Sequence, residues 1–150
     1  QAIPAFDKFI EKNTATPAAY LYRANSYLEI KEADFAIRDY DLYLQANPND
    51  VAVMLNKAQA RMIKKDFTNY IADLTAVLAI EPTNVAALSN RASAYAQQKN
   101  WQAVIADLTA AIAVEQKADY YYDRGFANYS MKTAESLPFQ HVKVPTPQTE

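Results

Sequence analysis

Residues 42–50 read LYLQANPND, and residues 76–84 read AVLAIEPTN. Both segments close an apolar helical pattern with a proline, and the two prolines, Pro48 and Pro82, stand at a spacing of 34. Three further kinds of residue return at this spacing: the cations Arg23, Lys57 and Arg91, the aspartates Asp39, Asp73 and Asp107, and the isoleucines Ile37, Ile71 and Ile105. Four kinds of position at one spacing indicate an internal repeat. The repeat divides the chain into units 17–50, 51–84 and 85–118.

Each unit carries the pattern of two helices joined by a short turn. Apolar residues recur every three or four positions in two stretches of each unit, which places them on one face of a helix. Asp50, Asn84 and Asn100 stand just before such stretches, where a side-chain oxygen can cap a helix, and Thr16 precedes Pro17 in the same way. We therefore expect a helix–turn–helix in every unit.

The composition excludes most catalytic and cofactor chemistry. The 150 residues include one His, one Gly and no Cys. A thiolate metal site or a two-histidine metal site cannot be built from them, and a phosphate-binding loop needs more than one glycine. We therefore expect no catalytic residue, no cofactor and no metal. A net charge of −2 without long charged runs gives no basis for nucleic-acid binding, and no apolar run approaches the length that spans a membrane.

The repeat resembles the tetratricopeptide repeat family, whose unit is a helix–turn–helix of about 34 residues. That family has a small residue at position 8 of the unit, a tyrosine near 11, an aromatic residue at 17, an alanine at 20 and a proline at 32. Here position 8 holds Ala24, Ala58 and Ala92, position 17 holds Ala33, Phe67 and Trp101, and position 32 holds Pro48, Pro82 and Gln116. Arg61 replaces the tyrosine at 11, and Tyr70 and Val104 replace the alanine at 20, where we expect local repacking. The resemblance implies an all-α solenoid of seven or eight antiparallel helices in a right-handed superhelix.

The sequence predicts a single domain over residues 1–135, with a partial unit at each end. Residues 2–13 match the second helix of a preceding unit, and residues 118–131 match the first helix of a fourth, in which Arg124 echoes Arg91 one residue early. Gly125 then falls at the small position, where we expect it to permit close helix packing. Residues 136–150 contain three prolines and no helical period, so we expect an irregular tail.

The repeated cations and aspartates indicate structural ion pairs rather than a catalytic site. A single active site is not built three times, and partly buried charges require partners. We expect pairs between neighbouring helices that join Arg23, Lys57 and Arg91 to Asp39, Asp73 and Asp107. Loss of one partner should destabilise the solenoid, and a charge swap should restore it.

In tetratricopeptide proteins the first helices line a concave groove, chiefly at positions 2, 5, 9, 12 and 13 of each unit. The resemblance implies a neutral groove here, with amide and hydroxyl groups among apolar side chains. Such a surface can hydrogen-bond an extended peptide and seat its apolar side chains. The candidate groove residues are Leu21, Asn25, Leu28, Leu55, Asn56, Gln59, Met62, Ser89, Asn90, Ser93, Tyr122 and Phe126.

The carboxylate clamp by which some members of the family hold acidic tails is not expected in this chain. That clamp combines Lys at 5 and Asn at 9 in one unit, Asn at 6 in the next, and Lys at 2 with Arg at 6 in the third. Asn25 and Asn56 are present, but Leu21, Ala86 and Asn90 stand where the cations belong. A carboxylate ligand gains little without cationic partners.

A dense aromatic cluster admits two interpretations. Residues 120–122 are all tyrosine, and Phe126 and Tyr129 follow at helical spacing. The cluster could anchor a partner, because aromatic side chains dominate binding hot spots. The interpretation that we favour is a core face that a missing half-unit, or the tail through Phe139, would cover.

The predicted function is a non-catalytic scaffold that binds a protein or peptide in its groove. The alternative is a self-assembling module that forms a homo-oligomer by stacking the open ends of the solenoid. Neither nucleic acid nor a membrane is expected as a partner. This function rests on the resemblance, because a fold does not by itself specify what a protein binds.

Overall fold

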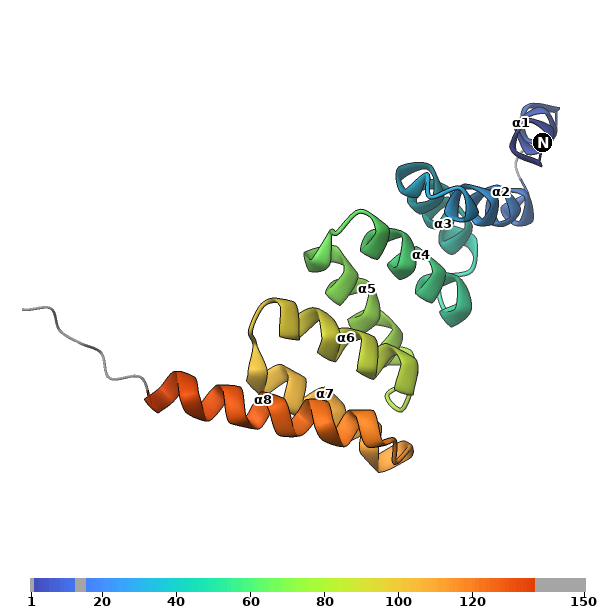
Figure 1. Cartoon of the computed structure of the whole chain (residues 1–150). Coiled ribbons are helices and arrows are strands. Elements are labelled where there is room, and N and C mark those ends of the chain that lie inside the picture. The colour runs from blue at the N-terminus through green and yellow to red at the C-terminus, as the bar shows by residue number, and fades with distance from the viewer. Residues whose placement is uncertain (1, 13–15, 137–150) are drawn as a thin grey trace, which may run out of the picture.

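The structure is a computed structural model that describes residues 2–12 and 16–136. Within these ranges it contains eight helices and no strand, which confirms the all-α solenoid. The helices follow one another along a curved array that runs from α1 to α8 (Figure 1). Their bounds are α1 (Ala2–Lys12), α2 (Pro17–Glu29), α3 (Ala33–Ala46), α4 (Val51–Ile63), α5 (Phe67–Ile80), α6 (Val85–Gln97), α7 (Trp101–Val114) and α8 (Ala118–Ser136).

In the division that we propose, α2–α3, α4–α5 and α6–α7 are complete units, and α1 and α8 belong to partial ones. Helix α8 runs to Ser136, beyond the end that we expected at residue 131. No proline or glycine stands between Phe126 and Ser136 to stop it, and Thr133 hydrogen-bonds back to the Tyr129 and Ser130 carbonyls. Residues 137–150, which include Phe139 and nearly all of the expected tail, lie outside the described residues.

Small residues allow successive helices to pack closely. The position-8 residues Ala24, Ala58 and Ala92 are at most 2% exposed. A second small residue, at position 10, is fully buried in Ala60, Ala94 and Ala127. Ala127 stands one position earlier than the spacing of the repeat predicts from Ala94, so α8 continues the array with its register shifted by one residue. The larger position-20 residues Tyr70 and Val104 are also buried in the core.

Gly125 does not have the packing role that we expected. A Cβ atom placed on Gly125 would meet no atom within 4 Å, so no close contact requires the missing side chain. In complete units the equivalent alanine faces the second helix of its own unit. Because α8 is the last described helix, Gly125 has no such helix in the described part of the chain. The expectation of close packing at this glycine is therefore wrong.

The turn inside each complete unit closes on a lysine with a left-handed backbone. Lys31, Lys65 and Lys99 have φ angles of 62°, 58° and 56°. In the first turn the Glu32 N–H donates to the Tyr27 carbonyl (2.9 Å) and the Lys31 N–H donates to the Leu28 carbonyl (3.0 Å), and the other two turns repeat both bonds. These bonds satisfy carbonyls at the helix end. Glycine normally fills this position, because a side chain costs free energy in the left-handed region.

Helix starts follow the sequence signals, with one exception. The side chains of Asp50, Asn84 and Asn100 each accept a hydrogen bond from the N–H three residues later. Thr16 occupies the cap position of α2, but its hydroxyl makes no capping bond. The Ala19 N–H that such a bond would use donates to the Thr16 main-chain carbonyl instead (2.9 Å).

In each complete unit a cation on the first helix joins that helix to the second helix of its own unit and to the preceding second helix. Arg23 on α2 donates two hydrogen bonds to Asp39 on α3, from Nε (2.5 Å) and Nη2 (2.8 Å), and a third from Nη1 to Asp7 on α1 (2.8 Å). The hydrogen bond with Asp39 raises the pKa of the Arg23 guanidinium in spite of the opposing effect of burial. Asp39 is completely buried. The three helices are thus tied together through one side chain.

The same link recurs along the array. Arg91 on α6 holds Asp107 on α7 through two bonds of 2.9 and 2.7 Å, and reaches back to the Thr75 hydroxyl on α5 (3.0 Å). Arg124 on α8 reaches back to the Thr109 hydroxyl on α7 (3.3 Å). Each link therefore joins a first helix to the unit before it.

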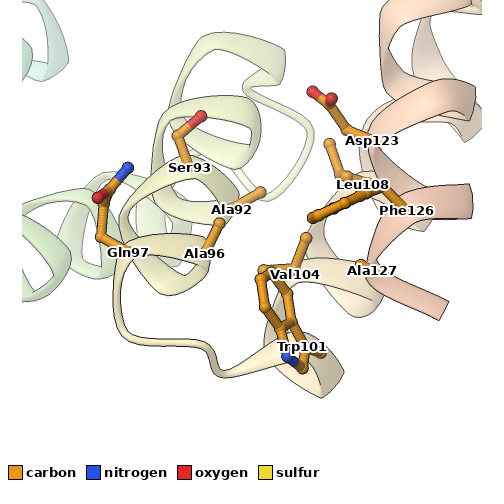
Figure 2. Close-up of a pocket in the computed structure, with 10 residues that line it drawn as sticks. All are labelled: Ala92, Ser93, Ala96, Gln97, Trp101, Val104, Leu108, Asp123, Phe126 and Ala127. Atoms are coloured by element: carbon orange, nitrogen blue, oxygen red, sulfur yellow. The ribbon is translucent and has the colours of Figure 1, made fainter. Parts of the chain in front are cut away.

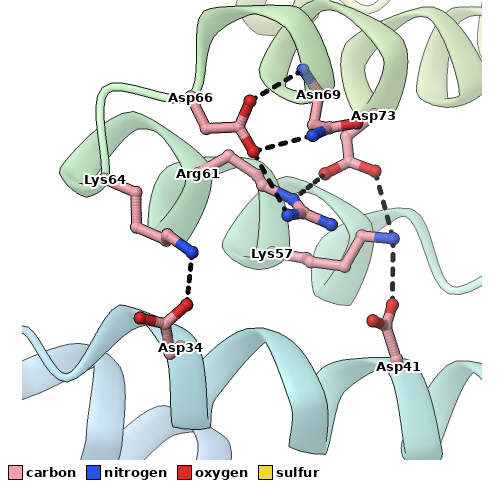
Figure 3. Close-up of polar contacts among 8 residues, drawn as sticks. All are labelled: Asp34, Asp41, Lys57, Arg61, Lys64, Asp66, Asn69 and Asp73. Atoms are coloured by element: carbon pink, nitrogen blue, oxygen red, sulfur yellow. Dashed lines mark hydrogen bonds and ion pairs between the residues drawn. The ribbon is translucent and has the colours of Figure 1, made fainter.

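The middle unit divides this role between two cations (Figure 3). Lys57 contacts one oxygen of Asp73 (3.0 Å) and reaches back to Asp41 (3.2 Å). Arg61 lies 3.6 Å from the other oxygen of Asp73 and 3.3 Å from Asp66. A lysine offers a single charged nitrogen, whereas arginine offers a planar fork that matches a carboxylate. Arg61 thus supplies the second contact, which accounts for its presence at position 11, where the other units carry tyrosine.

We expect loss of Arg23 to destabilise the protein more than loss of Lys57. Arg23→Met leaves the buried Asp39 carboxylate with only the exposed Arg38 at 3.5 Å, and should cost about 3–5 kcal/mol. Lys57→Met leaves Asp73 paired with Arg61 and should cost about half as much. Urea unfolding of both variants measures the difference. Equal losses would contradict the shared role of the two cations at Asp73.

Glycine should stabilise the three turns. Replacement of Lys31, Lys65 or Lys99 by glycine removes the left-handed strain and should raise the free energy of unfolding by about 0.5–1 kcal/mol each. Ala72→Gly, in the middle of α5, is the control and should cost about 1 kcal/mol, because its backbone is an ordinary helix. Thermal unfolding distinguishes these outcomes, and a loss of stability at all three lysines would refute the explanation.

Candidate functional site

Two cavities lie between successive first helices. One, of about 410 Å³, lies between α4 and α6 over α5. The other, of about 390 Å³, lies between α6 and α8 over α7. Their linings are equivalent by the repeat, and the matching pairs are Ala58 and Ala92, Gln59 and Ser93, Met62 and Ala96, Tyr70 and Val104, Leu74 and Leu108, and Asn90 and Asp123. We call the surface of α4, α6 and α8 that contains both cavities the groove.

The cavity between α4 and α6 brings together five of the candidate residues. Helix α4 contributes Leu55, Asn56, Gln59 and Met62, and α6 contributes Asn90. The floor comes from Tyr70 and Leu74 on α5, both buried. The cavity therefore has an apolar floor with amide groups around it. Such a lining can seat an apolar side chain and hydrogen-bond the main chain next to it.

The cavity between α6 and α8 is more aromatic (Figure 2). Ser93 and Phe126 are its two predicted members. Trp101, the first residue of α7, closes one end, and its ring meets the Phe126 ring edge to face with centroids 5.9 Å apart. Asp123 on α8 stands at the other end in this view, across from Ser93. This cavity therefore combines an apolar floor with a carboxylate.

Sequence reasoning missed Trp101, Val104, Leu108 and Asp123. The first three belong to a second helix, whereas the resemblance predicts groove walls from first helices only. Asp123 is equivalent to Asn90 once the one-residue shift of α8 is applied. The sequence signal for this shift is Arg124, which stands one residue earlier than the repeat spacing from Arg91 predicts.

The remaining candidates lie outside both cavities. Leu21, Asn25 and Leu28 line the first unit, where Tyr40 takes the place of the leucines in the later units. The Tyr40 hydroxyl donates to the Asn25 side-chain oxygen (2.7 Å). Burial, with a smaller effect of Glu29, raises the pKa of Tyr40 to about 12. The Tyr40 ring is fully buried against Leu21 and Leu28.

Ser89 and Tyr122 differ in their surroundings. The half-buried Ser89 donates its hydroxyl to the Ala86 carbonyl of its own helix (3.3 Å). Tyr122 is 76% exposed on α8. Both lie on first helices of the groove, but neither lines a cavity.

A third cavity lies at the other end of the array. It has about 360 Å³ and an apolar lining from α1 and α2 that includes Phe6, Phe9 and Tyr22. Phe6 stacks on Tyr22 with ring centroids 6.0 Å apart. Phe9 and Tyr22 are 45% and 57% exposed. This end therefore presents apolar surface.

The described residues offer neither a metal-ligand cluster nor a membrane-spanning helix. They contain no group of three or more His, Asp or Glu side chains placed to hold a metal ion. Of the helices described, none has the length and apolarity needed to cross a membrane.

The comparisons with known proteins identify the fold. No protein-family model and no curated protein matches the chain. A crystal structure of MamA protein matches with a TM-score of 0.71 and 28% identity over 79% of this chain and 66% of that one, so this chain spans just under two thirds of its length. The first TPR domain of Spaghetti (RPAP3), bound to the HSP90 peptide SRMEEVD, matches with a TM-score of 0.68 and 18% identity over 77% and 93% of the two chains. The TPR2B domain of yeast Sti1, in complex with pHsp70, matches with a TM-score of 0.62 and 18% identity over 79% and 97%. With its regular internal repeat and its array of helix pairs, the chain has the fold of the tetratricopeptide-repeat domains among these structures.

Proposed function

We propose that this chain is a non-catalytic scaffold that holds an extended segment of a partner protein in the groove. The observation that supports this most directly is the pair of equivalent cavities, which repeat along α4, α6 and α8. Two apolar floors at a regular spacing suit a chain whose side chains point into the groove at intervals. Affinity then accumulates over successive units.

The polar groups around the floors suit a peptide main chain. Asn56, Gln59 and Asn90 surround the first cavity, and Ser93 and Gln97 stand beside the second. Amide and hydroxyl side chains both donate and accept hydrogen bonds, as the peptide group requires. These groups would also orient the bound segment. The lining of the first cavity carries no charged side chain, so the segment needs no charge there.

Two of the solved structures that share this fold contain a peptide or protein ligand, as described above. They support peptide binding as a use of this fold. They do not identify the ligand of this chain, because proteins that share a fold can bind different ligands.

Two negative charges in the first cavity should weaken peptide binding strongly. Peptides selected by the wild-type chain from a displayed random library should bind the variant Leu55→Glu with Met62→Glu at least about tenfold more weakly, because both charges lie in the apolar part of the cavity lining. Ile80→Glu with Val114→Glu is the matched control, since both residues are exposed at the ends of second helices. Unchanged binding by a variant that keeps its helical circular dichroism would overturn the proposal.

Self-assembly is a second candidate, and the surface of α8 favours it. Tyr121 is 43% exposed, whereas the equivalent Leu88 on α6 is 4% exposed. The apolar cavity between α1 and α2 lies at the opposite end of the array. Two copies could therefore stack end to end.

Light scattering separates the two candidates. A monomeric scaffold keeps the mass of 16.8 kDa at every concentration. Self-assembly predicts a mass that rises with concentration. The double variant Tyr121→Ser with Phe9→Ser removes exposed aromatic surface from both ends of the array and should keep the monomer mass. A constant mass would rule out self-assembly and leave the scaffold.

A further inference from the structure

The charges on the two sides of the first helices are segregated. At positions 2, 5, 6, 9, 12 and 13 of the four described first helices, the charged side chains are Glu29, Asp119 and Asp123, and none is a lysine or arginine. The repeated cations lie on the side that faces the second helices, where ion pairs and hydrogen bonds hold them. The groove side is therefore acidic, although the protein as a whole is nearly neutral.

Asp123 is the carboxylate that lines a cavity. It makes no ion pair with any other described residue. Its neighbour Arg124 is engaged elsewhere, with the Thr109 hydroxyl at 3.3 Å and the guanidinium carbon 5.5 Å from the centre of the Tyr121 ring. A cation supplied by a ligand would therefore meet an unpaired carboxylate.

The rest of the cavity lining complements a long cationic side chain. Ala92, Ala96, Val104 and Leu108 form an apolar floor that suits an aliphatic stem (Figure 2). Ser93 and Gln97 add hydrogen-bond acceptors. Trp101 and Phe126 add aromatic surface, which can pack against the stem. An uncharged side chain would use the floor and leave Asp123 without a partner.

We infer that the cavity between α6 and α8 takes an arginine or lysine side chain from an extended partner segment, with the cationic group at Asp123. This inference rests on the proposed function and names the partner's chemistry. The equivalent cavity between α4 and α6 has Asn90 in place of Asp123, so it takes an uncharged side chain. An acidic segment is repelled, because Asp119 and Asp123 are both negative.

A selection experiment on the full chain tests the sign of the preference. A displayed random-peptide library is selected in parallel on the wild-type chain, on Asp123→Asn and on Asp123→Lys. The wild-type chain should enrich one position for arginine or lysine, Asp123→Asn should lose this enrichment, and Asp123→Lys should enrich aspartate or glutamate there. Glu32→Gln removes one negative charge at the start of α3, where the side chain makes no capping bond, and should leave the enrichment unchanged.

The affinity of one selected peptide then gives the size of the effect. Trp101 is the one tryptophan in the chain and lies in the cavity, so its fluorescence reports occupancy. Replacement of the basic residue by norleucine, which keeps an aliphatic stem, should weaken binding to the wild-type chain at least about tenfold and have little effect on Asp123→Asn.

The outcomes separate this inference from the proposed function. Selected peptides that depend on Leu55 and Met62 but carry no basic residue, or that ignore Asp123→Asn, overturn the cationic inference and leave the scaffold in place. A library that yields no groove-dependent peptide overturns both. Enrichment of basic residues that persists in Asp123→Asn but vanishes in high salt assigns the preference to the general acidity of the groove and overturns the role of Asp123.

Discussion

The stacking of this solenoid depends on one cation at the seventh position of each first helix. Arg23 shows the principle most clearly, because it contacts Asp39 in its own unit and Asp7 in the preceding helix. Breaking a buried ion pair is costly. The contacts of Arg23 therefore restrict sliding of α2 against the second helix of its own unit and against the preceding helix. The geometry of one unit therefore determines that of the next.

The same constraint shapes the groove. Because the cations are held on the side of the second helices, the opposite side of the first helices lacks them and keeps only neutral and acidic groups. One position of the second helix that contributes to the floor differs between the first unit and the later ones. Tyr40 fills it in the first unit and bonds Asn25, whereas Leu74 and Leu108 are smaller and line cavities. Tyr40 therefore distinguishes the first unit from the two units whose leucines line cavities.

The departures from the repeat show how far sequence reasoning could go. Arg61 appeared as the loss of a tyrosine, and the structure shows it at Asp73, where it compensates for a lysine at the seventh position. Gly125 appeared to serve packing, but there is open space beside it. Thr16 holds a cap position but makes no capping bond. Each of these outcomes depends on which partner is within reach, and a repeat pattern contains no distances.

The sequence by itself determined the helices, their pairing and their order. Apolar spacing, capping residues and prolines act on neighbours within a few residues, so their effect can be read locally. A repeat that recurs along the chain also implies that its units stack in the same way. The candidate groove residues Leu55, Asn56, Gln59, Met62 and Asn90 followed from this register. Only the tertiary structure decided which of them share a cavity, and that Trp101 and Asp123 belong to one. Each cavity is lined by three helices, and its volume depends on side chains that meet only after the chain has folded.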